Sequence, residues 1–253
     1  MTSASDSASG KPGQTFVDGN QMKRYPVEFE IAGPAAMFSR PDTGAAPISY
    51  PVPTWSACKA IFESVARGFV AKDVASAFFC PTKVEIRRPV RFERYVTNYR
   101  GPLRKSDQIK KEASYQLQTT ILVDVCYRVW GETVQIPGAT EGGVNGAHAL
   151  QEIFDRRMAK GASKYSPCLG WKEFLPSYFG PFREGAEWHA RFPVQSEETR
   201  QLSAFLLSVW DAPINGKYDP VFRELPIKGG MLRFPHVTLT NGKLVFEEDS
   251  HAG

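Results

Sequence analysis

The feature that most restricts what this 253-residue chain can fold into is a long alternation of side-chain character from Tyr115 to Trp130. Every second residue from Leu117 to Val129 is apolar, aromatic or Thr, which predicts one face of a strand. The predicted second face carries four polar residues, Gln118, Thr120, Asp124 and Arg128. This is the strongest strand signal in the sequence, so the fold has to contain a sheet built around it.

Weaker patterns on either side complete an order of strand, helix, strand, strand, helix. Residues 25–31 alternate as a half-buried strand, and a helix with Thr54 as its N-cap follows and stops at Gly68. A further strand is expected to run through residues 84–92, and a second helix after a Gly-rich loop ends at Gly161. This order is that of a ferredoxin-like half, a fold that carries many functions.

The sequence changes in texture near residue 165. From there on, short apolar runs are separated by Pro, Gly and Asn, and Asn241-Gly242 is a strong hairpin signal. We therefore predict an α+β protein in three parts. A disordered tail covers residues 1–22, a ferredoxin-like domain with a basic strand and loop at residues 83–114 covers residues 23–164, and a smaller antiparallel β lobe covers residues 165–253.

Composition limits the class of protein. No apolar run approaches the roughly 18 residues that a membrane-spanning helix needs, and residues 1–19 are rich in Ser, Gly and Ala, which excludes a secretory signal there. The four cysteines lie far apart, at Cys58, Cys80, Cys126 and Cys168. These patterns predict reduced thiols in a cytoplasmic protein, with no metal site and no cofactor.

Charge is concentrated in one segment. The net charge is +4, and between Lys83 and Lys111 ten Lys or Arg residues face three acidic residues, Glu85, Glu93 and Asp107. Such a run is either an ordinary solvated surface or a stripe that binds phosphates.

Three stretches resemble the CRISPR-associated Cas-five family, in its type I-C (d subtype) branch. In the first, a strand that ends at Gly33 is followed by FSRP at residues 38–41 and by SYPVPTWSA at residues 49–57. In the second, NGAH at residues 145–148 precedes IFDRR at residues 153–157 and CLGWKEF at residues 168–174. The third is VTLTNGKLVF at residues 237–246, which looks like a C-terminal hairpin of the family.

The resemblance implies a member of the RAMP superfamily, whose ferredoxin-like (RRM-like) domain precedes a C-terminal β extension. Relatives of this kind grip the 5′ repeat-derived handle of CRISPR RNA inside a Cascade surveillance complex, next to its backbone and large subunits, in antiviral defence. In the type I-C branch the same protein also cuts the precursor RNA. The partners implied are therefore CRISPR RNA and other Cascade subunits, and no membrane.

Single-stranded RNA is held by phosphate contacts and by bases that stack on aromatic rings or guanidinium planes. The basic segment offers both kinds of group, with Phe92 expected to be a core residue. The predicted RNA-binding residues are Arg87, Arg88, Arg91, Arg94, Tyr95, Tyr99, Arg100, Arg104 and Lys105.

The family's cleavage groups are only partly matched. The resemblance places the family's first-helix aromatic on Ala66 and its Lys-His pair on Ala147 and His148, so two of three groups are absent. Without an insertion of two residues the pair falls on Ala149 and Leu150 instead, and nothing catalytic remains. A His at the start of a helix, where free N–H groups favour a phosphate, is a suitable general base.

Two functions stay open at this point. The chain is either an RNA-binding subunit without cleavage activity, or a metal-independent endoribonuclease that uses His148. In the second case Lys59, Lys160 or Lys164 could replace the missing cation.

Overall fold

The computed structural model describes residues 23–67, 70–71, 74–99, 105–112, 115–138 and 145–247. The predicted tail, and Arg100 and Arg104 of the basic segment, lie outside the described residues. The described chain is a mixed α/β structure in which a mostly antiparallel sheet dominates and helices are few. No helix within these ranges is long and apolar enough to cross a membrane.

One eight-stranded sheet organises the molecule, in the order β7-β1-β6-β4-β10-β9-β8, with β5 paired to β6 beside this path. Its strands are β1 (Arg24–Ala36), β4 (Ala77–Ile86), β5 (Phe92–Tyr99), β6 (Tyr115–Gln135), β7 (Tyr178–Gly180), β8 (Arg200–Trp210), β9 (Tyr218–Lys228) and β10 (Met231–Arg233). Two small hairpins stand apart: β2 (Val70–Ala71) with β3 (Val74–Ala75), and β11 (Val237–Thr240) with β12 (Lys243–Phe246).

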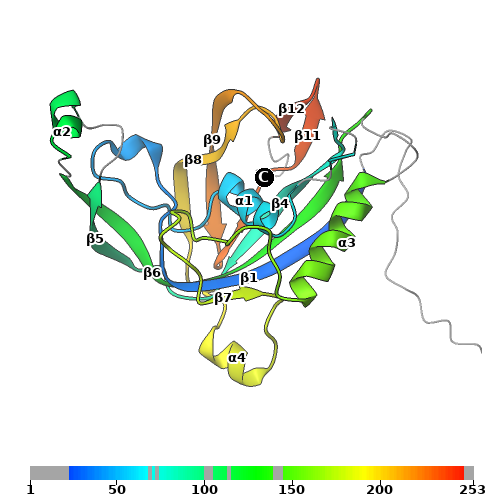
Figure 1. Cartoon of the computed structure of the whole chain (residues 1–253). Coiled ribbons are helices and arrows are strands. Elements are labelled where there is room, and N and C mark those ends of the chain that lie inside the picture. The colour runs from blue at the N-terminus through cyan, green and yellow to red at the C-terminus, as the bar shows by residue number, and fades with distance from the viewer. Residues whose placement is uncertain are drawn as a thin grey trace, which may run out of the picture.

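The helices cover the two faces of the sheet unequally. Their bounds are η1 (Pro41–Thr43), α1 (Trp55–Val65), α2 (Ser106–Lys110), α3 (Gly146–Ala159) and α4 (Ala186–Arg191). In Figure 1, α1 and α3 lie on the upper face of the sheet, α4 lies below it, and the β5–β6 hairpin extends away with α2 near its tip. The main core lies under α1 and α3, where Phe62 stacks on Phe79 and packs edge-on against Phe29.

The long alternation does form a strand, β6, and its length is explained by two successive partners. Its C-terminal half pairs with β4 from Tyr127 onward, and its N-terminal half pairs with β5 up to Leu122. Between them Asp124 has a φ of 51°, which interrupts the regular pleat. Because the segment around α4 covers the second face, Cys126 and Arg128 on that face are buried, although a polar, solvated face was predicted.

Both helices predicted from sequence are confirmed. Thr54 is the N-cap of α1, and its side chain accepts a hydrogen bond from the Ala57 N–H at 3.1 Å. The helix ends at Val65, before the predicted stop. The helix α3 begins directly after Asn145, whose side chain caps it.

The prediction of one strand through residues 84–92 is wrong. The strand β4 ends at Ile86 and β5 begins at Phe92, so Arg87 to Arg91 form a connection between two strands. Pro89 lies in that connection and has no N–H to donate to a ladder, which explains the break. The alternation expected for the arginines of a regular strand therefore does not apply.

The C-terminal strands continue the same sheet. The strand β10 pairs with β4, and β7 pairs with β1 at the opposite edge, so the predicted boundary near residue 164 does not separate two sheets. The hairpin predicted at Asn241-Gly242 is confirmed between β11 and β12. Both turn residues have positive φ, 52° and 77°, as a two-residue turn of this kind requires.

Candidate nucleic-acid interface

The two faces of the β5–β6 hairpin carry different chemistry. Arg94 is the register partner of Thr120, and Phe92 is the partner of Leu122, so these side chains share one face. Phe92 is 38% exposed on this face, which corrects its expected place in the core. Tyr95 points to the other face, where its ring lies 5.5 Å from that of Phe174.

A cleft of about 610 Å³ opens at the root of the hairpin, on the face that carries Phe92. Arg40 and Arg200 contribute to its wall from opposite sides, together with Tyr50 and Thr120. Arg40 lies over the Tyr50 ring at 5.6 Å and is held by Asp42 at 2.7 Å, so its guanidinium has a fixed place. The arrangement combines cations and an exposed aromatic ring in a concave surface, as binding of single-stranded RNA requires.

The structure divides the predicted RNA-binding residues into exposed and interior groups. Arg91, Arg94 and Lys105 are exposed, and Arg88 is half-buried, 3.3 Å from Asp124. Tyr99 ends β5. Arg87 is only 4% exposed; it donates to Glu85 at 2.9 Å and lies over the Trp188 ring at 4.7 Å. Its guanidinium is directed into the molecule rather than toward a ligand at the hairpin.

Arg87 belongs to a cluster that sequence reasoning missed, between the lower face of the sheet and α4. Glu30 is fully buried at its centre and accepts from Arg183 Nε at 2.6 Å and from Arg128 Nε at 3.3 Å. Arg128 also lies 4.3 Å from the centre of the Trp188 ring. The signal in the sequence was Glu30 itself, a carboxylate inside an otherwise apolar strand, since such a group is buried only when it is paired.

His148 lies in the first turn of α3, and its side chain is half exposed. Its backbone N–H donates to Asn145 Oδ1 at 3.3 Å, and the N–H of Ala147 donates to Gln135 Oε1 at 3.1 Å. The expectation of free N–H groups at this helix start is therefore wrong for these two residues. The imidazole itself packs against Tyr25, with ring centroids 5.2 Å apart.

The positions of the absent family groups are buried. Ala66 is 1% exposed and Ala147 is fully buried in the main core. A lysine at position 147 would therefore place its charge in an apolar environment beside the sheet, at a cost in stability.

The three lysines named as substitutes lie away from His148. Lys160 follows the last turn of α3, about 18 Å along the axis from His148 at 1.5 Å per residue. The backbone N–H of Lys164 donates to Ser64 O at the end of α1, and Lys59 forms an ion pair with Glu63 within α1. None of these three is placed to act with His148.

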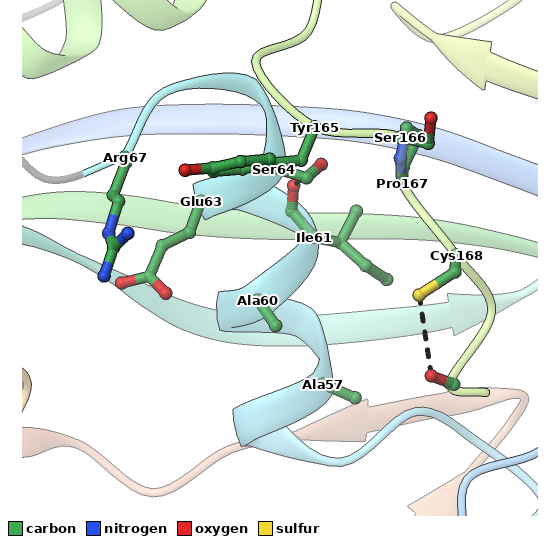
Figure 2. A pocket seen from close by; sticks show the side chains of 11 residues that line it. Ala57, Ala60, Ile61, Glu63, Ser64, Arg67, Tyr165, Ser166, Pro167 and Cys168 are labelled. Atoms are coloured by element: carbon green, nitrogen blue, oxygen red, sulfur yellow. Dashed lines mark hydrogen bonds between the residues drawn. The ribbon is translucent and has the colours of Figure 1, made fainter. Parts of the chain in front are cut away.

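A second hollow, of about 330 Å³, lies between α1 and the segment Tyr165 to Gly170 (Figure 2). Cys168 is the nucleophile nearest to hand there, and its Sγ lies 3.5 Å from Gly170 O. Burial raises the pKa of this thiol, so it is held in the unreactive protonated form. Since the lining contains no histidine, we assign no chemistry to this hollow. Elsewhere in the described ranges, no three His, Cys, Asp or Glu side chains gather in a way that could hold a metal ion.

Two curated proteins are similar to this chain in sequence, and both carry the name CRISPR pre-crRNA endoribonuclease Cas5d. The protein from Thermus thermophilus is 30% identical over 162 residues, which is 61% of this chain and 63% of that protein, less than two thirds of its length. The protein from Mannheimia succiniciproducens is 25% identical over 224 residues, 83% of this chain and 94% of that protein. No family model matches the chain.

A solved structure described as a CRISPR-associated protein has a similar fold. It aligns with a TM-score of 0.60 and 18% identity, and the alignment covers 86% of this chain and 95% of that one. The two relatives, with this likeness of fold, support a member of the Cas-five family.

Proposed function

We propose that this chain is the Cas-five subunit of a Cascade-type surveillance complex and binds the repeat-derived 5′ handle of CRISPR RNA. The observation that carries the proposal is the basic face of the β5–β6 hairpin, where Arg94 and Phe92 stand above a cleft walled by Arg40 and Arg200. The names of the two relatives agree with it, since both refer to CRISPR RNA. Cytoplasmic location and the backbone and large subunits as partners belong to the same proposal.

We further propose the ferredoxin-like RAMP architecture and the type I-C branch for the chain. Support comes from the order β7-β1-β6-β4, in which α1 follows β1 and α3 follows β6 along the chain. This is the strand and helix order of a ferredoxin-like domain. The strands β8 to β10 then form the C-terminal β extension that the resemblance implies.

The first test is the salt dependence of RNA binding. The surplus of seven positive charges between Lys83 and Lys111 should neutralise several phosphates of a repeat RNA. Each phosphate contact on a single strand contributes about −0.7 to the slope of log affinity against log salt concentration. We expect a slope steeper than about −2 in filter-binding or fluorescence-anisotropy titrations. An affinity that is unchanged between low and high salt would remove the assignment of this segment to RNA.

A second test uses the two sides of the molecule. Arg94→Glu should weaken binding of repeat RNA by roughly tenfold and reduce the salt slope by about one contact, because Arg94 shares the face of the cleft. Arg191→Glu changes the net charge equally but lies on α4, on the other side of the sheet (Figure 1). Equal losses from the two variants would mean that only total charge matters, and that the hairpin face is no binding surface.

We also propose, as a second function, that the chain cleaves precursor CRISPR RNA within the repeat without a metal ion. The observation that favours it is that His148 is exposed and lies beside a tyrosine, although the family's other groups are absent. Both relatives are named as endoribonucleases. A purified protein that cuts repeat RNA in EDTA would support this function, and one that only binds the RNA would leave the first function alone.

A further inference from the structure

The proposed cleavage lacks a proton donor for its leaving group, and the structure offers one beside His148. Tyr25 is the second residue of β1, on the strand face that also carries Phe29 and packs toward α3. Its ring meets the imidazole of His148 edge-on, at an interplanar angle of 61°. Both side chains reach solvent at this end of α3.

Hydrogen bonds fix the tyrosine and leave its proton available. The hydroxyl oxygen of Tyr25 accepts from Asn145 Nδ2, while Asn145 Oδ1 accepts from the His148 N–H. One asparagine therefore ties the tyrosine to the cap of the helix that carries the histidine. In the described part of the chain no acceptor takes the proton of the Tyr25 hydroxyl.

A further contact keeps β1 and the start of α3 in register. Gln151 Nε2 donates to Pro26 O at 2.9 Å, so the turn that carries His148 is anchored beside Tyr25. Since both residues lie on regular elements rather than on loops, the geometry of the pair is well defined.

The position of the family's missing aromatic is at the other end of this helix. Arg157 in the last turn of α3 donates to Val65 O, next to Ala66. Along the helix axis that turn is about 14 Å from His148, at 1.5 Å per residue. A side chain at position 66 could not act with His148 on one phosphate, whereas Tyr25 can.

We propose that Tyr25 is the general acid, and His148 the general base, of the RNA cleavage proposed above, on which this inference rests. His148 takes the proton of the ribose 2′-hydroxyl, the O2′–P bond forms, and the P–O5′ bond breaks. Tyr25 gives its proton to the departing O5′, and the tyrosinate regains a proton from water as the imidazolium loses one. The products are a 2′,3′-cyclic phosphate and a 5′-hydroxyl, with no metal ion required.

The test is a change of leaving group in the full-length protein. Tyr25→Phe keeps the ring and removes only the hydroxyl, and should lower cleavage of repeat RNA by roughly 10²-fold or more, as expected for a lost general acid. A substrate with sulfur in place of the bridging 5′-oxygen has a leaving group that needs no proton. Tyr25→Phe should cleave that substrate at nearly the wild-type rate, whereas His148→Ala should stay slow on both substrates.

A matched control is Tyr165→Phe, since Tyr165 is an exposed tyrosine beyond the opposite end of α3, and it should cleave like the wild type. Wild-type rates for Tyr25→Phe on the normal substrate, or an equal loss on both substrates, would overturn the role of Tyr25 while the cleavage function stands. If the wild-type protein binds repeat RNA but cleaves neither substrate, the cleavage function fails and the inference with it. The second substrate thus separates a lost proton donor from a disturbed helix cap.

Discussion

Replacing His148 by alanine is expected to lower the rate of RNA cleavage by roughly 10²–10⁴-fold, the usual effect of removing a general base. The reaction should proceed in EDTA, because His148 and Tyr25 are the acid and base that the proposal assigns and neither depends on a metal. The measurement is a single-turnover assay on repeat RNA, with the cyclic phosphate end identified in the product.

Binding of the RNA should hardly change in the same variant, because a neutral imidazole adds little to the release of counterions. His236→Ala is the matched control: this histidine is similarly exposed and paired with a glutamate, but it lies in the C-terminal hairpin region. Equal cleavage by His148→Ala and wild type would show that other groups carry the reaction. Loss of binding together with cleavage would indicate a role in holding the RNA instead.

Local patterns in the sequence predicted most of the elements of the fold. Thr54 caps a helix whose apolar stripe packs on the sheet, and Asn241-Gly242 makes the hairpin turn. These features depend on interactions between residues that are close in sequence, so a single chain is sufficient to infer them.

Pairings between distant residues were not predictable in the same way. Nothing local to Arg87 indicates that α4 covers it, because Trp188 and His189 come from far along the chain. For the same reason Phe92 was expected inside and is exposed, while Tyr95, expected to meet RNA, packs on Phe174. Which face of a strand is covered depends on tertiary packing, and the residue pattern of a strand that has both faces covered carries little information about it.

The candidate cleavage site shows the same division. His148 could be singled out from the sequence, since a His near a helix start is a local feature. Tyr25 was identified only as a core-facing residue of the first strand, because its contact with His148 bridges β1 and α3. Replacing Ala147 by Lys, which the resemblance suggests as a restoration, is expected to unfold the start of α3 rather than add activity, since position 147 is fully buried.

The largest loss of stability is expected from Glu30→Gln, which should lower the free energy of unfolding by about 3–5 kcal/mol, the usual cost of removing one partner from a buried ion pair. Glu30 is fully buried and is the carboxylate shared by Arg128 and Arg183. Its loss leaves those guanidinium groups between the sheet and α4 without their buried counter-charge. Urea denaturation, followed by circular dichroism, measures the change.

Glu184→Gln is the matched control, because Glu184 also pairs with Arg128, at 3.1 Å, but its side chain is 63% exposed. An exposed pair of this kind contributes about 0–1 kcal/mol, so the two glutamates should differ severalfold in their effect on unfolding. The double variant Glu30→Gln with Arg183→Gln should lose less than the sum of the two single losses, since the second change removes a cation that the first left unpaired. Similar small losses for Glu30→Gln and Glu184→Gln would mean that the stacked rings of Trp188 and its neighbours, not the buried carboxylate, hold α4 against the sheet.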